Sequence, residues 1–205
     1  MEPQHIGDAL DYWKGALLGS LSRRSLLSDL RVDRMTDEVD IADQPVIPDG
    51  QWTPLDRQLY AHLLQITTAQ ILEHSKPLVS REEYFAEIPK SGDVFLDPDV
   101  GVATGRCREC HVRIPDIWPV LKASPSRVVA IYQHVRGDVT ARVDDVVSAI
   151  ADASEKRLHW CCYESGTVAM LFLSLDHERP SLIAAHFQDC LNPRTERSLV
   201  WEICG

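Results

Sequence analysis

The amino-acid sequence predicts an α/β fold in which a mostly parallel β-sheet lies between layers of helices and ends in an antiparallel hairpin near the C-terminus. Three observations support this prediction. Apolar runs at 93–97, 127–133 and 167–173 alternate with amphipathic helical patterns, as in a parallel sheet covered by helices. The run at 127–133 (RVVAIYQ) is rich in β-branched residues, which is typical of a buried strand. The turn residues 164–166 (ESG) separate two further apolar runs and predict a hairpin.

The first half of the chain contains fewer strands than the second half. Leu10 begins an apolar stripe that returns with helical spacing, Thr53 is a favourable N-cap before Pro54, and Ser80 begins a capping-box pattern. We therefore expect, in order, a helix over 8–21, a strand over 30–35, a loop over 39–53, a helix from residue 54, a short helix over 81–87 and a strand over 93–97.

The second half alternates regularly between helices and strands. Val143, Val146, Val147 and Ile150 share one side of a helix. We expect, in order, a short helix over 115–122, a strand over 127–133, a helix over 140–153, strands over 158–163 and 167–174, a helix over 177–190 and an edge strand over 198–203. A length of 205 residues is enough for one domain with a substantial core, so we expect a single α/β domain over 1–205.

Composition narrows the class of protein. Hydrophobic content of 44% and charged content of 25% are ordinary for a soluble globular protein. A formal net charge of −10 argues against a general polyanion binder, which needs an excess of Lys and Arg. The N-terminus lacks the pattern of a signal peptide, and apolar stretches fall short of the roughly 18 residues that a membrane span needs. We therefore expect a cytoplasmic protein without membrane contact, whose six cysteines are thiols.

The stretch Cys107-Arg-Glu-Cys110-His111 has the spacing of c-type haem attachment. That chemistry needs an exported chain, and a zinc site needs four ligands, whereas no second pair of cysteines or histidines has suitable spacing. We therefore expect neither haem nor zinc there. The sequence also lacks GxSxG, GxxxxGK[ST] and GxGxxG, which lowers support for nucleotide hydrolysis on a P-loop and for standard dinucleotide binding.

Polar groups follow the predicted strands where the strands end. In α/β sheets ligands bind beyond the carboxyl ends of the strands, so groups at these ends are candidates for one shared site. The pairs at these positions are Asp37 with Glu38, Asp97 with Asp99, Gln133 with His134, and Glu164 with Ser165.

Asp97 and Asp99 are the central candidates, in the stretch GDVFLDPDVGVATG at 92–105. Their carboxylates can hold a divalent cation such as Mg²⁺ or Mn²⁺, or can accept hydrogen bonds from a polar substrate. The alternative is a simple turn that ends the strand. His134 can act as general base or metal ligand, and its alternative is a structural histidine. Lys14 can neutralise an anionic group, and its alternative is a solvated surface lysine.

The polar groups near the hairpin are further candidates. Glu164 can supply a carboxylate, and Ser165 and Thr167 can supply hydroxyls to a substrate, together with Asp37 and Gln133 at the other strand ends. The alternative for the hairpin residues is an ordinary turn.

The block FLDPD at 95–99, after a helix bearing DYWKGALL, resembles an uncharacterised bacterial family with a similar FLDPDNG block. More distantly it resembles Rossmann-type adenine-N6 methyltransferases, including those that act on ribosomal RNA. The resemblance covers 8–21 and 92–174. It implies a Rossmann-like three-layer sandwich, a lysine placed like Lys14 on the N-terminal helix, and a hairpin at 158–174 that forms the antiparallel end of the sheet.

The sequence also departs from the methyltransferase pattern. Asp97-Pro98-Asp99-Val100 lacks the second proline and the aromatic residue that follows it in those enzymes. The segment 35–40 is acidic where they have the glycine-rich loop that holds S-adenosylmethionine. Binding of S-adenosylmethionine is therefore not expected.

Two functional hypotheses follow. The first is an enzyme that acts on a nucleotide or nucleic acid at a carboxylate-rich site, with Asp97 central, Asp99 and Glu164 assisting, and His134 transferring a proton. A divalent metal would relieve the crowding of negative charges in such a site. The alternative is a catalytically degenerate methyltransferase-like scaffold that serves as an acidic interaction module and neutralises a basic protein partner.

Overall fold

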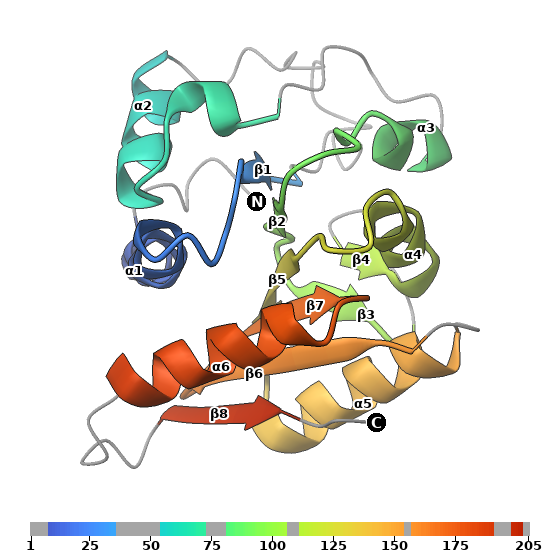
Figure 1. The fold of residues 1–205 in the computed structure, drawn as a ribbon. Helices are drawn as coiled ribbons and strands as arrows, with labels where there is room; N and C mark the ends of the chain where they lie inside the picture. Colours follow the sequence, from blue (N-terminus) through green and yellow to red (C-terminus); the bar gives the residue numbers. More distant parts are fainter. Residues whose placement is uncertain are drawn as a thin grey trace, which may run out of the picture.

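The computed structural model describes residues 8–35, 54–72, 81–105, 111–153, 157–190 and 198–202, the last group and 54–56 by their backbone only. Its elements follow one another along the chain as shown in Figure 1. In order they are α1 (Ala9–Arg23), β1 (Arg31–Asp33), α2 (Pro54–Leu63), the 3-10 helix η3 (Thr68–Gln70), α3 (Arg81–Ala86), β2 (Val94–Leu96), β3 (Gly101–Ala103), β4 (His111–Arg113), α4 (Ile114–Lys122), β5 (Val129–His134), α5 (Val139–Asp152), β6 (His159–Ser165), β7 (Val168–Ser174), α6 (Glu178–Cys190) and β8 (Ser198–Glu202).

The central sheet is mixed and has the strand order β1-β2-β5-β7-β6-β8. Strands β1, β2 and β5 are parallel, and β7 lies antiparallel between β5 and β6. Because β6 is antiparallel to β7, it runs in the direction of β1, β2 and β5, while β8 runs with β7. The α/β class, the parallel part of the sheet and the antiparallel hairpin near the C-terminus are thus confirmed, and 93–97, 127–133 and 167–173 supply strands of one sheet.

Helices cover both faces of the sheet, which makes the three layers of the predicted sandwich (Figure 1). One face, called the α1 face below, packs against α1, α2 and α6 in a single apolar cluster that includes Leu18, Tyr60 and Phe187. The other, called the α5 face, packs against α3, α4 and α5 in a second cluster that includes Leu121 and Ile150. Both faces of the strands are therefore buried, which explains why the strands read as continuous apolar runs.

Helices α1 and α2 approach each other very closely at Gly15. A Cβ atom on Gly15 would lie 1.7 Å from the carbonyl oxygen of Leu63, so only glycine allows this contact. Helix α1 begins where the carboxylate of Asp8 accepts hydrogen bonds from the backbone N–H groups of Leu10 and Asp11, at 2.8 and 3.1 Å. The contact holds the C-terminal end of α2 beside the middle of α1.

The structure differs from the sequence predictions in three places. Residues 101–103 and 111–113 pair as a small parallel sheet, β3–β4, where no strand was predicted. The strand expected over 30–35 ends at Asp33, because the Asp33 carboxylate accepts the backbone N–H of Met35 at 3.0 Å and Met35 turns into the left-handed region with φ +44°. The strand expected over 93–97 is limited to β2, although the Asp93 carbonyl still accepts the N–H of Arg31 and the N–H of Asp97 still donates to the Asp33 carbonyl. The predictions for the loop over 39–53, for Thr53, for Ser80 and for Cys107 and Cys110 lie outside the described residues.

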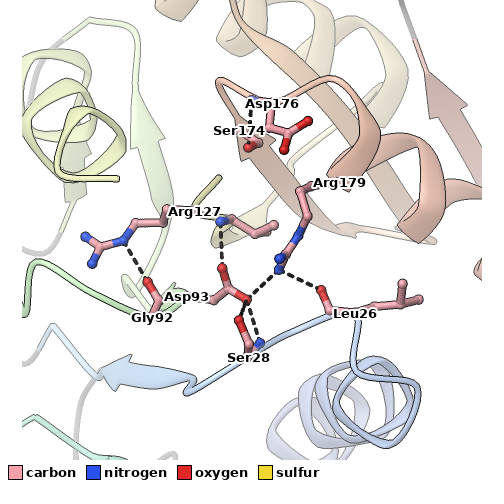
Figure 2. A network of polar contacts seen from close by, with 9 residues as sticks. Leu26, Ser28, Gly92, Asp93, Arg127, Ser174, Asp176 and Arg179 are labelled. Carbon is pink, nitrogen blue, oxygen red and sulfur yellow. Dashed lines mark hydrogen bonds and ion pairs between the residues drawn. The ribbon is translucent and has the colours of Figure 1, made fainter. Parts of the chain in front are cut away.

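The amino ends of the strands are joined by a network around Asp93 (Figure 2). One carboxylate oxygen of Asp93 accepts the backbone N–H of Ser28 and a guanidinium N–H of Arg179, both at 2.7 Å. The other accepts the backbone N–H of Val128 at 2.8 Å. Arg127 donates to the Gly92 carbonyl at 2.7 Å. The network connects the segments before β1, β2 and β5 to α6.

Within the described residues no helix combines the length and apolar character needed to cross a membrane.

Candidate functional site at the carboxyl edge of the sheet

The carboxyl ends of the parallel strands meet at one edge of the sheet and bring the predicted groups together. Asp97 directly follows β2, and His134 ends β5, the next strand in the sheet. Ser165 ends β6 at the same edge, because β6 runs in the direction of β5. The prediction that the carboxyl ends bearing Asp97 and His134 are neighbours is confirmed.

The segments that follow β1 along the chain lie on opposite sides of β1 in the sheet. Ile71 forms a parallel bridge to Val32, and the N–H of Leu72 donates to the Val32 carbonyl at 2.8 Å. These contacts lie on the side of β1 away from β2, since the neighbouring residues of β1 bond to β2. In open α/β sheets the ligand site lies where the strand order reverses in this way, outside the carboxyl ends of the strands. The boundary between β1 and β2 is therefore the expected position of a site, and Asp97 stands there.

Asp97 is the centre of a buried ionic network. Its Oδ2 accepts the Tyr60 hydroxyl at 2.7 Å and the Lys14 ammonium at 3.0 Å, and its Oδ1 lies 2.8 Å from the same ammonium. Lys14 also contacts Oδ1 of Asp11 at 3.2 Å and lies 4.6 Å from the centre of the Tyr132 ring. Asp11, Lys14 and Asp97 are 0%, 4% and 1% exposed. The solvated alternative for Lys14 is therefore excluded, and Lys14 neutralises Asp97 from α1.

The pKa values of Lys14, Tyr60 and Tyr132 are all raised. Burial is the largest single influence on Lys14 and would lower its pKa, but Asp97 and Asp11 outweigh it, so the pKa is raised. Burial, then the charge of Asp97, raises the pKa of Tyr60 well above its usual value. Burial likewise raises the pKa of Tyr132 to about 12. At neutral pH Lys14 is charged and both tyrosines are protonated.

The candidate residues divide between the two faces of the sheet, because side chains alternate along a strand. Phe95, Tyr132 and Tyr163 belong to the cluster on the α1 face, whereas Leu96, Ile131 and Cys162 belong to the cluster on the α5 face. Alternation from these residues places Asp97, His134 and Ser165 on the α1 face, and Asp33, Gln133 and Glu164 on the α5 face. The predicted cooperation of Asp97 with Glu164 therefore has to occur around the edge of the sheet.

Asp33 is a buried carboxylate that sequence reasoning did not select. It accepts the hydroxyl of Tyr84, whose pKa burial and then Asp33 raise well above its usual value. Asp33 and Asp97 sit side by side on the two faces, and the N–H of Asp97 donates to the Asp33 carbonyl at 2.8 Å. The sequence predicts site residues at strand ends, and it predicts that this strand continues past Asp33 to residue 35.

Gln133 binds the backbone that follows the Asp97 segment. Its side-chain oxygen accepts the N–H of Val102 at 2.9 Å, and its nitrogen donates to the carbonyls of Val100 and His134 at 3.1 and 2.8 Å. Gly101, with φ +117°, passes so close that a Cβ there would lie 2.4 Å from the Gln133 oxygen. In this structure the amide of Gln133 holds the loop that carries Asp99.

The remaining predicted residues have varied surroundings. Asp99 is exposed, His134 is half-buried, and Thr167 is exposed in the hairpin turn, where its carbonyl accepts the N–H of Val135 at 2.8 Å. Glu164 is buried and accepts the Thr140 hydroxyl at 3.4 Å. Asp37 lies outside the described residues. Among the residues that the structure describes, no three His, Cys, Asp or Glu side chains gather in a way that could hold a metal ion.

No family model matches the chain, and no curated protein matches it. Among solved structures, the chain is similar to the protein LPL1258 from Legionella pneumophila, described under the family model DUF519. The two share 12% sequence identity over 98% of this chain and 97% of the other, with a TM-score of 0.42. A likeness of this size assigns no function.

Proposed function

We propose that the protein is an enzyme that acts on a nucleotide or nucleic acid at the carboxyl edge of the sheet, with Asp97 as its central group. The observation that supports this most is the buried network of Asp97, Lys14 and Asp11 beside the β1–β2 boundary. Moving each ion out of water costs roughly several kcal/mol, and the attraction between the opposite charges offsets this cost. Buried charged groups that carry this desolvation cost, at the position where α/β sheets bind ligands, are candidates for catalysis.

Each group has a specific role in this proposal. Asp97 accepts hydrogen bonds from a polar group of the substrate through Oδ1, which is ion-paired with Lys14 but accepts no well-aligned hydrogen bond from the described residues. His134, on the next strand and the same face, transfers a proton. Asp97 is closed to solvent, so substrate entry requires the residues that surround it to move.

A divalent cation stays part of the proposal as a prediction. Mg²⁺ is commonly held by one or two carboxylates together with water and substrate phosphates. Asp97 and Asp99 supply that number of carboxylates without a third protein ligand. Because Lys14 already neutralises Asp97, the cation would compete with its ammonium group.

The nucleotide assignment draws support from the sheet. The antiparallel β7 lies between β5 and β6, as the resemblance to Rossmann-type adenine-N6 methyltransferases implied at the level of fold. S-adenosylmethionine is not part of the proposal, because β1 is followed by the turn Asp33-Arg34-Met35 with a buried Met35. Calorimetric titration with S-adenosylmethionine should show no saturable binding in the micromolar range, and clear saturation there would restore a methyltransferase function.

The test compares Asp97 with an aspartate at the opposite edge of the sheet. Binding of the four ribonucleoside 5′-monophosphates and of short single-stranded RNA and DNA is measured by calorimetry, with and without Mg²⁺ or Mn²⁺. Asp97→Asn should weaken binding about tenfold or more, because a hydrogen bond to a charged group is lost. Asp29→Asn is the control, since Asp29 lies at the amino edge, shortly before β1, and its side chain is exposed. Absence of nucleotide and oligonucleotide binding, or equal binding by both variants, would contradict the proposal.

The acidic interaction module is the second candidate. The exposed carboxylates of Asp144, Asp145 and Asp152 on α5 would form its contact surface. Buried carboxylates, by contrast, gather mainly at the carboxyl edge, as Asp11, Asp33, Asp97 and Glu164. This distribution favours the enzyme. Substituting the three α5 aspartates with Asn should leave nucleotide binding unchanged if the first proposal is correct.

A further inference from the structure

A second charged cluster lies at the carboxyl edge, on the α5 face. Arg81 begins α3, Arg113 directly precedes α4, and Arg34 follows β1. Helices α3 and α4 each lead to the amino end of a parallel strand, β2 and β5. Their first residues therefore lie toward the carboxyl edge, where Arg34 also stands.

One carboxylate orients two of these arginines. Oδ2 of Asp116 accepts Nε of Arg81 at 2.7 Å and the backbone N–H of Arg113 at 2.8 Å. The Arg113 guanidinium reaches Asp116 only through longer contacts, at 3.3 and 3.4 Å. The Arg113 side chain is 43% exposed and that of Arg81 is 19% exposed, while Asp116 is buried. Arg81 also donates to the His111 carbonyl, so both guanidinium groups are fixed in position, and both side chains are partly open to solvent.

Arg34 belongs to the same cluster. Arg34 is buried and directly follows Asp33, whose carboxylate accepts the Tyr84 hydroxyl of α3, the helix that begins with Arg81. The chain as a whole carries a formal net charge of −10, which makes a gathering of three arginines at one edge notable. Arginine is well suited to phosphate, because its planar fork donates two parallel hydrogen bonds to phosphate oxygens.

We infer that Arg81 and Arg113 bind phosphate of the substrate; this inference rests on the proposed function and adds where the anionic part of the nucleotide lies. On the α1 face two buried carboxylates, Asp11 and Asp97, outnumber Lys14 and repel a phosphate. Arg81 and Arg113 on the α5 face attract it, because their side chains are partly exposed whereas the carboxylates beside them, Asp33 and Asp116, are buried. Asp33 and Asp97 are bonded neighbours on β1 and β2, so the two clusters meet at the boundary where a ligand is expected.

The test uses inorganic pyrophosphate as probe, titrated calorimetrically into wild type, Arg113→Gln, Arg113→Lys and Arg31→Gln. Arg31→Gln is the matched control, because Arg31 has a similar exposure, 33% of its side chain, but begins β1 at the amino edge. Wild type and Arg31→Gln should bind alike, Arg113→Gln about tenfold or more weakly, and Arg113→Lys between them, because lysine lacks the fork. Binding should weaken as NaCl rises. Circular dichroism confirms that each variant is folded.

The outcomes separate this inference from the proposed function. Absence of pyrophosphate binding, or equal binding by Arg113→Gln and Arg31→Gln, overturns the phosphate site. If nucleotides then still bind in an Asp97-dependent manner, the proposed function stands without it. If pyrophosphate binds through Arg113 but no nucleotide or oligonucleotide binds, the phosphate site stands and the nucleotide substrate is wrong. Arg81→Gln, folded by the same criterion, should reproduce the loss seen for Arg113→Gln, and unchanged binding would remove Arg81 from the site.

Discussion

The contact between α1 and α2 can be tested with a single methyl group. In Gly15→Ala the new Cβ would lie 1.7 Å from the Leu63 carbonyl oxygen, 2.7 Å from its carbonyl carbon and 2.9 Å from Cα of Leu64. All three atoms are backbone, so no side chain can rotate away. Restoring an ordinary contact of 3.4 Å requires α1 and α2 to separate by 3.4 − 1.7, or about 1.7 Å. Movement of that size along the 2.7 Å bond between Tyr60 and Asp97 would break it.

The free energy of unfolding should fall by about 1.5–5 kcal/mol. Forcing a methyl group into a packed contact costs about 1–3 kcal/mol, and losing a hydrogen bond to a charged group costs about 1.5–3 kcal/mol. The better helix propensity of alanine returns about 1 kcal/mol. Gly19→Ala, one turn later, is the matched control. The atoms nearest to its new Cβ belong to the Gln65 side chain, whose amide end can rotate away, so its stability should stay within about 1 kcal/mol of wild type.

Urea unfolding followed by far-UV circular dichroism measures both variants by linear extrapolation. A Gly15→Ala variant as stable as Gly19→Ala would refute the reasoning, because it would mean that α1 and α2 do not approach as closely as described. Nucleotide binding offers a second measurement. Gly15→Ala should weaken it, since Lys14 and Tyr60 reach Asp97 from the two displaced helices.

Three further predictions follow from the site and its surroundings. Stability should fall as pH rises from about 10 to about 12, because the unfolded chain releases the Tyr132 proton near pH 10 while the native state holds it until about 12. Urea unfolding across this range should show a smaller loss of stability in Tyr132→Phe than in wild type. An equal loss in that variant would contradict the stated origin. Gln133→Ala should lower stability by about 1–3 kcal/mol, because it leaves buried backbone groups unsatisfied; thermal unfolding indistinguishable from wild type would argue against that role. Purified protein should contain no stoichiometric zinc or haem, and about one zinc per chain by metal analysis would show this expectation to be wrong. Replacing Cys107 and Cys110 with serine should hardly change the melting temperature.

Much of the fold could be read from local patterns. Strands β2, β5 and β7 are buried on both faces, so each appears as a continuous apolar run between turn residues. The β3–β4 pair was missed because each strand has only three residues, which is too short for an apolar run or an alternating pattern to predict a strand. Such short strands depend on each other and on the neighbouring β5 rather than on their own sequence.

The site was predictable only in part. Position at a strand end marked Asp97 and position on a helix marked Lys14, but their contact joins residues 83 positions apart. Tyr60 looked like an ordinary apolar helix residue, and its bond to Asp97 spans 37 positions. The division of Glu164 and Asp97 between two faces depends on which helices cover each face, and no local pattern states that. Tertiary packing therefore decides which predicted groups can act together.

The Asp93 network has a consequence for strand register. Strands β1 and β2 pair over three residues each, so their own ladder offers little resistance to a slip by one position. A slip of one residue turns every side chain of a strand to the opposite face, which would place Asp97 against α3 and α4, away from Lys14. Asp93 prevents this, because its carbonyl accepts the N–H of Arg31 at 2.8 Å and its carboxylate is tied to Ser28, Val128 and Arg179. From about 13 Å away, four residues along the chain, Asp93 thus fixes the face on which Asp97 appears.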